Sequence, residues 1–409
     1  MESELKETEI EELENSPAES KKGFYKGALC GALATLIICI VLVVVVVFVK
    51  MSGDNKVVNL QTELKIEAIQ EMMEEVYLYS DEIDAEKLRE SLIKGYVDGL
   101  GDPYTVYYDE EETKSLLEST SGEFGGIGVG ISQNTETGTI TFTTVYENSP
   151  GEAAGLKNGD IVYKVDGKDV TGEELDNVVS MIRGEKGTTV EITVFRGVNL
   201  EEYTCTVTRD IIEVTTVTYE MKENNIGYIA VSGFEKVTYH QFEEALNELT
   251  VQGAQALVID LRNNPGGNLS TVCEMLDLIL PEGTIVYTED KYGHRETITS
   301  DEEHQMSLPM AVLINGYSAS ASEIFAGALQ DYEAAILVGT TTYGKGIVQN
   351  LYQMTDGTCL KVTTSEYFTP NGRNIHGIGI EPDIEVEYIY NAANPEEDNQ
   401  LEAALNCLK

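Results

Sequence analysis

Basic and histidine side chains are scarce in this sequence, and their scarcity excludes several functions. The 409 residues include 27 lysines and arginines against 71 aspartates and glutamates, a formal net charge of −44. A nucleic-acid partner is therefore not expected, because phosphate binding needs a basic surface. The histidines are His240, His294, His304 and His376, and none stands in a motif suited to a Ser-His-Asp triad. His376 is kept as an outside candidate.

The cysteines show no spacing that indicates a metal or redox centre. Cys30 and Cys39 lie in an apolar run, and the others, Cys205, Cys273, Cys359 and Cys407, are far apart. The C-x-x-C spacing typical of zinc sites and thiol redox sites is missing. We expect core thiols, and we expect neither a metal nor a cofactor.

One long apolar run lies near the N-terminus. Residues 27–49 carry no charged side chain, and at about 1.5 Å per residue they can cross a hydrocarbon layer of about 30 Å. Because Lys21, Lys22 and Lys26 precede the run, the positive-inside rule places the acidic tail 1–26 in the cytoplasm and the rest of the chain outside. A cleaved signal peptide is the alternative, but the run is long and no A-x-A-like site follows. We expect a retained single-pass anchor in the cell membrane.

Periodicity divides the remaining chain into further regions. Apolar residues at helical spacing predict a small helical domain over residues 58–118, to which we assign no chemistry. Residues 119–208 contain short alternating segments, glycine turns and one helix, which predicts a small β domain. Over residues 209–390 strands alternate with helices, which indicates an α/β core. Residues 391–409 are expected to form a helical tail.

A glycine-rich loop opens the β region. It includes Gly126, Ile127, Gly128 and Val129, and its glycines allow backbone N–H groups to converge on an anion or a peptide carboxylate. A dinucleotide site is not expected, because the third glycine is misplaced and a strand follows instead of a helix.

The segments 149–156, 158–162 and 165–167 resemble the PDZ domain of bacterial proteases. The resemblance implies a β-barrel-like domain that binds a peptide as an added strand beside residues 127–131. The carboxylate of that peptide would lie in the loop of Gly126, Ile127, Gly128 and Val129, and its apolar side chains would face Val178, Val179 and Ile182. The alternative is a PDZ fold whose groove binds nothing, since a fold does not establish a function.

Two further segments carry candidate catalytic residues. Ser320 stands where an apolar strand passes into a helix, a place that can expose a hydroxyl beside helical N–H donors. Ser320 and Glu323 also fit the S-x-x-E capping box, which is the purely structural alternative. Lys345 lies between Gly344 and Gly346, and burial of such a lysine would lower its pKa toward the range of a general base. The preceding residues resemble a P-loop, but Gly346 replaces the required Ser or Thr and a strand follows.

The segments around these residues resemble the carboxy-terminal processing (tail-specific) peptidases, the Ser/Lys-dependent S41 family with a PDZ domain. The resemblance runs from about residue 60 to the C-terminus. Its motifs lie in residues 261–267, 312–320, 327–331, 342–349 and 379–383. It implies a multidomain chain whose α/β core has crotonase-like or ClpP-like topology.

The resemblance also implies roles for individual residues. Ser320 would be the nucleophile and Lys345 the general base, with Gln349 orienting the lysine. The N–H groups of Ala321 and of Gly266, preferred to Gly267, would form the oxyanion hole. Asp331 is interpreted as structural support, because a carboxylate beside Lys345 would raise the pKa of the lysine.

The expected function is that of a membrane-anchored serine endopeptidase. It would cleave extracytoplasmic proteins or peptides near their free C-termini, with the PDZ domain recognising or gating the substrate, and the family resemblance implies a homodimer. A catalytically dead PDZ adaptor is one alternative, but both Ser320 and Lys345 are present. An acyl-CoA enzyme on a related fold is another, but the sequence lacks a basic cluster for a nucleotide.

Overall fold

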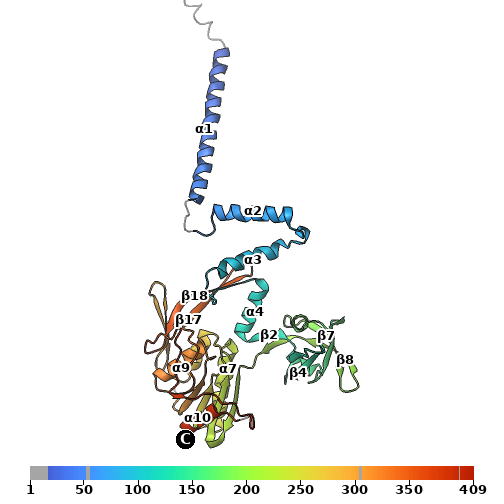
Figure 1. Ribbon diagram of the computed structural model, residues 1–409, viewed down its shortest axis with the longest axis vertical. Helices are drawn as coiled ribbons and strands as arrows, with labels where there is room; N and C mark the ends of the chain where they lie inside the picture. The colour runs from blue at the N-terminus through green and yellow to red at the C-terminus, as the bar shows by residue number, and fades with distance from the viewer. Residues whose placement is uncertain (1–16, 52–55, 304–305, 396) are drawn as a thin grey trace, which may run out of the picture. The chain divides into compact units, whose positions relative to one another are not determined.

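The computed structural model describes residues 17–51, 56–303, 306–395 and 397–409 (Figure 1). Most of the predicted tail 1–26, residues 52–55 after the apolar run, and His304 lie outside the described residues. The chain divides into two compact units, residues 1–89 and 90–409, and the boundary falls within one helix. The domain limits expected from the sequence remain a prediction.

The first unit is helical. It contains α1 (Pro17–Met51), α2 (Leu60–Val76), the 3-10 turn η1 (Ser80–Glu82) and the beginning of α3 (Ala85–Asp98). Residues Tyr25–Val46 of α1 are apolar and exposed, with a mean hydropathy of 3.2, so this helix is long and apolar enough to cross a membrane. A signal sequence passes the same test.

The second unit begins with the end of α3, the short strand β1 (Val106–Tyr108) and α4 (Glu110–Ser121). The sequence determines both ends of α4. Asp109 and Glu112 form a reciprocal capping box at its start, and Gly122 ends it in the left-handed conformation with φ of +74°.

A five-strand path in the order β3-β4-β5-β7-β8, with β6 beside β5, forms the body of the β domain. Its elements are β3 (Val129–Gln133), β4 (Ile140–Val145), α5 (Pro150–Ala153), β5 (Ile161–Val165), β6 (Lys168–Asp169), α6 (Leu175–Ile182), β7 (Thr189–Arg196) and β8 (Glu201–Thr208). The entering strand β2 (Glu123–Gly126) pairs with the leaving strand β9 (Asp210–Glu213). This pairing closes the domain as an insertion in the chain.

The α/β core contains a sheet in the order β10-β11-β12-β15-β16-β19. Its strands are β10 (Val217–Lys222), β11 (Ile226–Val231), β12 (Ala256–Asp260), β15 (Met310–Ile314), β16 (Ile336–Gly339) and β19 (Ile384–Glu385), with η2 (Glu223–Asn225) between the first two. The strands from β11 to β19 are parallel, and β10 is antiparallel to β11. The α/β pattern predicted from the sequence is present.

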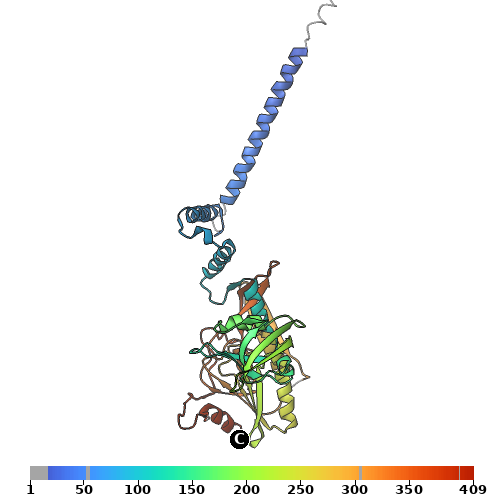
Figure 2. The ribbon, with the colours of Figure 1, turned by 90° about the vertical axis from the view of Figure 1, so that its right-hand side faces the viewer.

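Both faces of this sheet are buried. Successive side chains of a strand point to opposite faces, and each face packs against helices. Leu257 and Ile259 of β12 join the main core with α7 (Lys236–Val251), α8 (Leu269–Asp277) and α9 (Ala321–Asp331). Val258 points the other way, toward α10 (Asn399–Cys407) and its fully buried Ala404. Figure 2 shows α10 near the C-terminus, within the segment 391–409 that was expected to be a helical tail.

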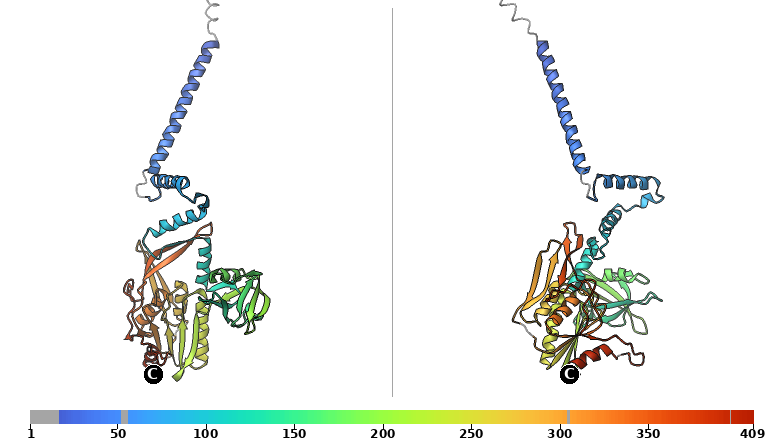
Figure 3. Two further views of the ribbon diagram at one scale, coloured as in Figure 1. Left: turned by 45° about the vertical axis from the view of Figure 1, so that its right-hand side comes forward. Right: turned by 60° about the vertical axis from the view of Figure 1, so that its left-hand side comes forward.

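A second sheet joins distant parts of the sequence. It contains β13 (Gly283–Asp290), β14 (Arg295–Ser300), β17 (Ile347–Gln353) and β18 (Cys359–Phe368), with β17 and β18 side by side in Figure 3. The early strand β1 adds to β18, with Val106 opposite Lys361. Residues just after α3 are thereby fixed against the core.

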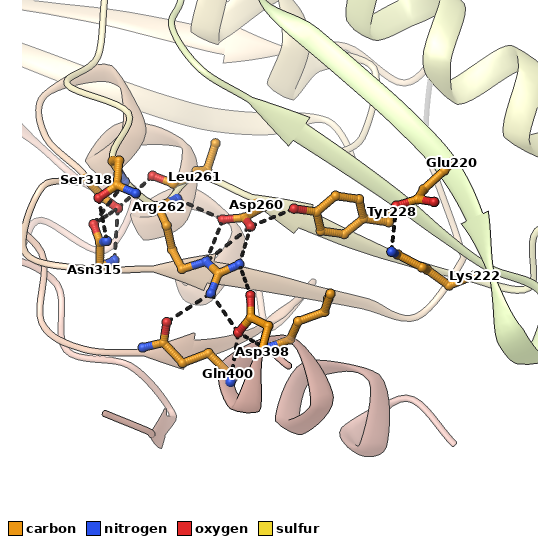
Figure 4. Close-up of polar contacts among 12 residues, drawn as sticks. Glu220, Lys222, Tyr228, Asp260, Leu261, Arg262, Asn315, Ser318, Asp398 and Gln400 are labelled. Atoms are coloured by element: carbon orange, nitrogen blue, oxygen red, sulfur yellow. Dashed lines mark hydrogen bonds and ion pairs between the residues drawn. The ribbon is translucent and has the colours of Figure 1, made fainter. Parts of the chain in front are cut away.

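The guanidinium of Arg262 attaches α10 to the end of β12 (Figure 4). It donates to Asp260 at 2.6 Å, to Asp398 at 2.7 Å and to Gln400 at 3.0 Å. Asp260 also accepts the Tyr228 hydroxyl at 2.8 Å. Because Arg262 immediately precedes the turn 263–267, this network fixes the point from which that turn begins.

Candidate active site

The three neighbouring serines occupy different environments. Ser318 is fully buried and donates to Leu261 O at 2.8 Å, as Figure 4 shows. Ser322 is fully buried and donates to Asn264 O at 2.9 Å. Ser320 is partly exposed and lines a cavity. Burial therefore separates Ser320 from its neighbours in the way that a nucleophile requires.

The backbone of Ser320 is strained. Its φ of +55° and ψ of −113° lie in a region that non-glycine residues rarely adopt. The Ser320 carbonyl accepts from Glu323 N at 2.8 Å, from Ile324 N at 3.0 Å and from the Tyr367 hydroxyl at 3.1 Å. Tyr367 is buried, and this burial raises its pKa well above 10, which keeps the phenol a neutral donor. These bonds hold the serine at the sharp turn that precedes α9.

Glu323 connects the serine to the segment that carries Lys345. Its carboxylate is fully buried and accepts Ser320 N–H at 2.9 Å, the capping-box contact predicted from the sequence. It also accepts Thr342 Oγ1 at 2.6 Å, Gly344 N–H at 2.7 Å and Lys345 N–H at 2.8 Å. One buried side chain thus fixes both backbone segments, and the sequence had suggested only its capping role.

Lys345 is half-buried, and its pKa is lower than the ordinary value of 10.5. Burial is the main cause, and the positive charge of Lys361 adds to it, whereas Asp102 and Glu323 act in the opposite direction. The direction is the one expected for a lysine that acts as a base.

Ser320 and Lys345 line one cavity of about 420 Å³. Its apolar wall includes Leu116, Phe234, Leu269, Ile324, Ile347 and Tyr367. Gln349 and Lys361 also line it, as do Ala321 and Gly267. A cavity with polar and apolar lining in about equal measure can accept both the backbone and the side chains of an extended peptide.

The turn 263–267 lies directly against the nucleophile. A side chain on Gly266 would place its Cβ 2.7 Å from Ala319 O and 2.9 Å from Ser320 Cβ. The buried Asn264 shapes the turn: its Oδ1 accepts Gly266 N–H at 2.9 Å, and its carbonyl accepts Ala319 N–H at 3.0 Å.

This geometry argues against the sequence-based preference for Gly266 as an oxyanion donor. The Gly266 N–H already bonds to Asn264 Oδ1. Gly267 is exposed and lines the cavity. Ala321 also lines it, and as the first residue of α9 its N–H has no partner within the helix.

The other predicted residues have separate positions. Gln349 donates to Thr363 Oγ1 at 3.4 Å, and no hydrogen bond joins it to Lys345 in the described parts of the chain. Asp331 pairs with Arg373 at 2.5 Å and accepts Asn371 N–H at 2.8 Å, which fits structural support. His376 is exposed, is not part of the cavity lining, and accepts Gly346 N–H at 3.3 Å through Nδ1.

In the β domain, the glycine loop is ordered by the α5 segment. The carbonyls of Ile127 and Gly128 accept from Gly151 N at 2.7 Å and Tyr146 N at 3.1 Å. Ile127 belongs to the core of this domain. The side chains of Val178 and Ile182 are also buried in that core, whereas Val179 is partly exposed. That this helix faces a bound peptide stays a prediction.

Some cavity residues come from a segment to which the sequence had assigned no chemistry. Leu116, Ser119 and Thr120 of α4 line the cavity, and Asn268 Nδ2 donates to Thr120 O at 2.9 Å. The ring of Tyr104, just before β1, lies 4.6 Å from Lys345 Nζ. No sequence signal pointed to these residues, because the contact depends on the pairing of β1 with β18.

Three family models match the chain. Peptidase family S41 matches residues 225–386, the PDZ domain matches residues 141–196, and the activating protease CtpB N-terminal domain matches residues 48–113. The resemblance to S41 peptidases with a PDZ domain is confirmed.

Similar proteins include the carboxy-terminal processing protease CtpA of Bacillus subtilis (strain 168), with 37% identity over 76% of this chain and 66% of that protein. A probable CtpA-like serine protease of Staphylococcus aureus (strain MSSA476) is 36% identical over 83% of this chain and 67% of its own length. Among solved structures, a photosystem II D1 C-terminal processing protease has 28% identity and a TM-score of 0.45, covering 81% of this chain and 94% of that chain.

The chain spans slightly less than two thirds of the first curated relatives that it matches, 65% and 66% of their lengths. The S41 match nevertheless covers the segment that contains Ser320 and Lys345. With this match and its identity to the Staphylococcus aureus protein, the chain belongs to peptidase family S41.

Proposed function

We propose that this protein is a serine endopeptidase that cleaves proteins or peptides near their free C-termini. The observation that carries the proposal is the placement of a strained Ser320 and a partly buried Lys345 on one cavity, with Glu323 bonded to the backbones of both. The names of its CtpA-like relatives support the reaction class.

The proposed reaction is acyl transfer. The neutral amine of Lys345 takes the proton of Ser320, and Oγ attacks the peptide carbonyl carbon. The N–H groups of Ala321 and Gly267 stabilise the oxyanion that forms; we replace Gly266 because its N–H is occupied. The Lys345 ammonium then protonates the leaving amine, and water hydrolyses the ester on Ser320. Gln349 is proposed to stabilise the pairing of β17 with β18 through its hydrogen bond to Thr363 Oγ1.

The test is peptide cleavage by the full-length chain in detergent. An unstructured peptide with a free apolar C-terminus should be cleaved by the wild type and not measurably by Ser320→Ala or Lys345→Ala. Ser322→Ala is the matched control for the serine, because its hydroxyl is buried in a structural hydrogen bond. It should retain cleavage. Unchanged cleavage by Lys345→Ala would contradict the proposed base.

We also propose that the PDZ domain recognises or gates substrates through the loop of Gly126, Ile127, Gly128 and Val129. The close packing of this loop supports a fixed site: a Cβ on Gly128 would lie 2.3 Å from Ser149 Cβ. Amidating the C-terminus of the test peptide should raise KM. An unchanged KM would show that the loop does not read a carboxylate.

We further propose that α1 anchors the protein in the cell membrane, with the N-terminus in the cytoplasm and the peptidase outside. The exposed apolar surface of Tyr25–Val46 supports the anchor. Protease protection of intact and permeabilised cells tests the orientation. Recovery of the full-length protein in the soluble fraction would contradict the anchor.

A homodimer and a crotonase-like core belong to the same proposal. No residue of α2 is buried, and its exposed side chains include Leu64, Ile69, Met72 and Val76. A second copy would cover this apolar face. Light scattering in detergent tests the dimer.

The parallel strands from β11 to β19 support the proposed crotonase-like topology of the core.

A further inference from the structure

The loop before β1 places an aromatic ring on the candidate base. Lys345 Nζ lies 4.6 Å from the centroid of the Tyr104 ring. Tyr104 is half-buried, and a ring face at this distance attracts an ammonium group. The contact joins residues far apart in the sequence, one just before β1 and the other just before β17.

Hydrogen bonds fix the loop that carries this ring. Asp102 accepts Tyr104 N–H at 3.0 Å and the Thr105 hydroxyl at 2.6 Å. Thr105 Oγ1 in turn accepts Thr363 N–H at 3.1 Å. Thr363 is the residue that pairs with Gln349. The loop is therefore bonded to the same strand pair that lines the cavity.

The groups that face Lys345 come from several elements. Asp102 and Tyr104 belong to the loop, Glu323 to α9 and Lys361 to β18, while Tyr343 and the exposed His376 flank the lysine segment. The hydrogen bond with Tyr343, together with burial and nearby acidic charges, raises the pKa of Tyr104 to about 12. The ring is therefore neutral at working pH.

We propose that Tyr104 is a positioning residue for Lys345: it holds the amine at the cavity and stabilises the ammonium that forms as Ser320 loses its proton. The inference rests on the proposed function, because it requires Lys345 to be the base. Lys345 is neutral before attack and positively charged in the transition state, so the ring stabilises the transition state more than the ground state.

The proposal predicts a specific pH profile of kcat/KM. Tyr104→Leu keeps the apolar bulk and removes the π face. The Lys345 ammonium of the free enzyme is then less stable, so the pKa of Lys345 falls and the acid limb moves to lower pH. The plateau of kcat/KM at high pH falls roughly tenfold. At low pH the kcat/KM values of the wild type and of Tyr104→Leu converge, because the ammonium is present in both the ground state and the transition state.

Two other substitutions distinguish the effect of the aromatic ring from the effects of the hydroxyl group and of side-chain volume. Tyr104→Phe keeps the ring and loses only the bond with Tyr343, so its profile should match the wild type. Tyr104→Ala admits water to the amine, which favours the charged form and moves the acid limb to higher pH. Thermal unfolding of each variant checks that the fold is intact.

The full-length protein in detergent and an unstructured peptide serve as enzyme and substrate. A Tyr104→Leu rate that falls equally at every pH, or a Tyr104→Phe loss as large as that of Leu, would overturn the inference. Lys345→Ala is measured in parallel. If it still cleaves, the proposed function itself fails; if it is inactive while Tyr104→Leu leaves the profile unchanged, only the role of Tyr104 fails.

Discussion

Glu323 and Lys345 are joined by a hydrogen bond of 2.8 Å from the lysine's backbone N–H to a fully buried carboxylate. The same carboxylate accepts the backbone N–H of Ser320 at 2.9 Å. The relative position of the two candidate catalytic residues thus depends on a side chain that is not itself part of the cavity lining.

Glu323→Gln should damage both stability and activity. Glutamine keeps one acceptor oxygen and replaces the other with an NH2 group. That group would face either the N–H groups of Ser320 and Lys345 or the Gly344 N–H and the Thr342 hydroxyl, leaving buried donors unsatisfied. We expect a loss of about 2–3 kcal/mol in the free energy of unfolding. Misplacement of the site should lower kcat about 100-fold or more. Denaturant unfolding and peptide cleavage measure the two effects.

Glu244→Gln is the matched control for this substitution. Glu244 lies on α7 and is exposed, so its replacement should change stability by no more than about 0.5 kcal/mol. Equal effects of the two substitutions would show that the bridging role of Glu323 is absent.

Lys361→Met should shift the pH dependence of cleavage. Burial is the largest cause of the lowered pKa of Lys345, and the positive charge of Lys361 is the second. Removing that charge makes the Lys345 ammonium easier to form, so the pKa rises and the acid limb of kcat/KM moves to higher pH. Lys361 lies over the ring of Tyr108, and the exposed Lys291 lies over the ring of Tyr292 in the same way. Lys291→Met should therefore leave the acid limb in place. A shift in the opposite direction would contradict the electrostatic account.

Gly266→Ala should abolish cleavage, whereas Gly253→Ala should not. Both glycines have positive φ, +104° and +90°. A Cβ on Gly266 meets Ala319 O at 2.7 Å and Ala321 N at 3.0 Å, and a Cβ on Gly253 meets nothing within 4 Å. Gly253→Ala therefore costs only backbone strain, about 1 kcal/mol. Retained cleavage by Gly266→Ala would mean that the turn does not press on Ser320.

Asp398→Asn should destabilise the protein in a pH-dependent way. Burial raises the pKa of Asp398, but hydrogen bonds from Arg262 and from the first amides of α10 outweigh this, so the pKa lies below its ordinary value. Such a carboxylate contributes stability that is fully present above its unfolded-state pKa and is lost as pH falls through its folded-state pKa.

The free energy of unfolding should therefore differ by about 2 kcal/mol between wild type and Asp398→Asn at neutral pH. The difference should shrink below about pH 4. Glu402→Gln, an exposed position on the same helix, is the control. A difference that persists unchanged in acid would assign the effect to packing instead of charge.

Much of the organisation could be predicted from the sequence, because local signals determine it. The apolar run gave α1, glycine turns and alternation gave the β domain, and alternating patterns gave the α/β core. The interpretation of Ser320 and Lys345 came from local motifs, and both residues line one cavity.

The sequence by itself determined which residues were candidates, since motif and periodicity are properties of neighbouring positions. Only the tertiary structure decided their environment. Ser318 and Ser322 are buried, and the Gly266 N–H is hydrogen-bonded to Asn264. Val178 and Ile182 pack in the core of the β domain. The pairing of β1 with β18 places Tyr104 beside Lys345. Such contacts depend on strand register and on hydrogen bonds between distant segments, which no local pattern encodes.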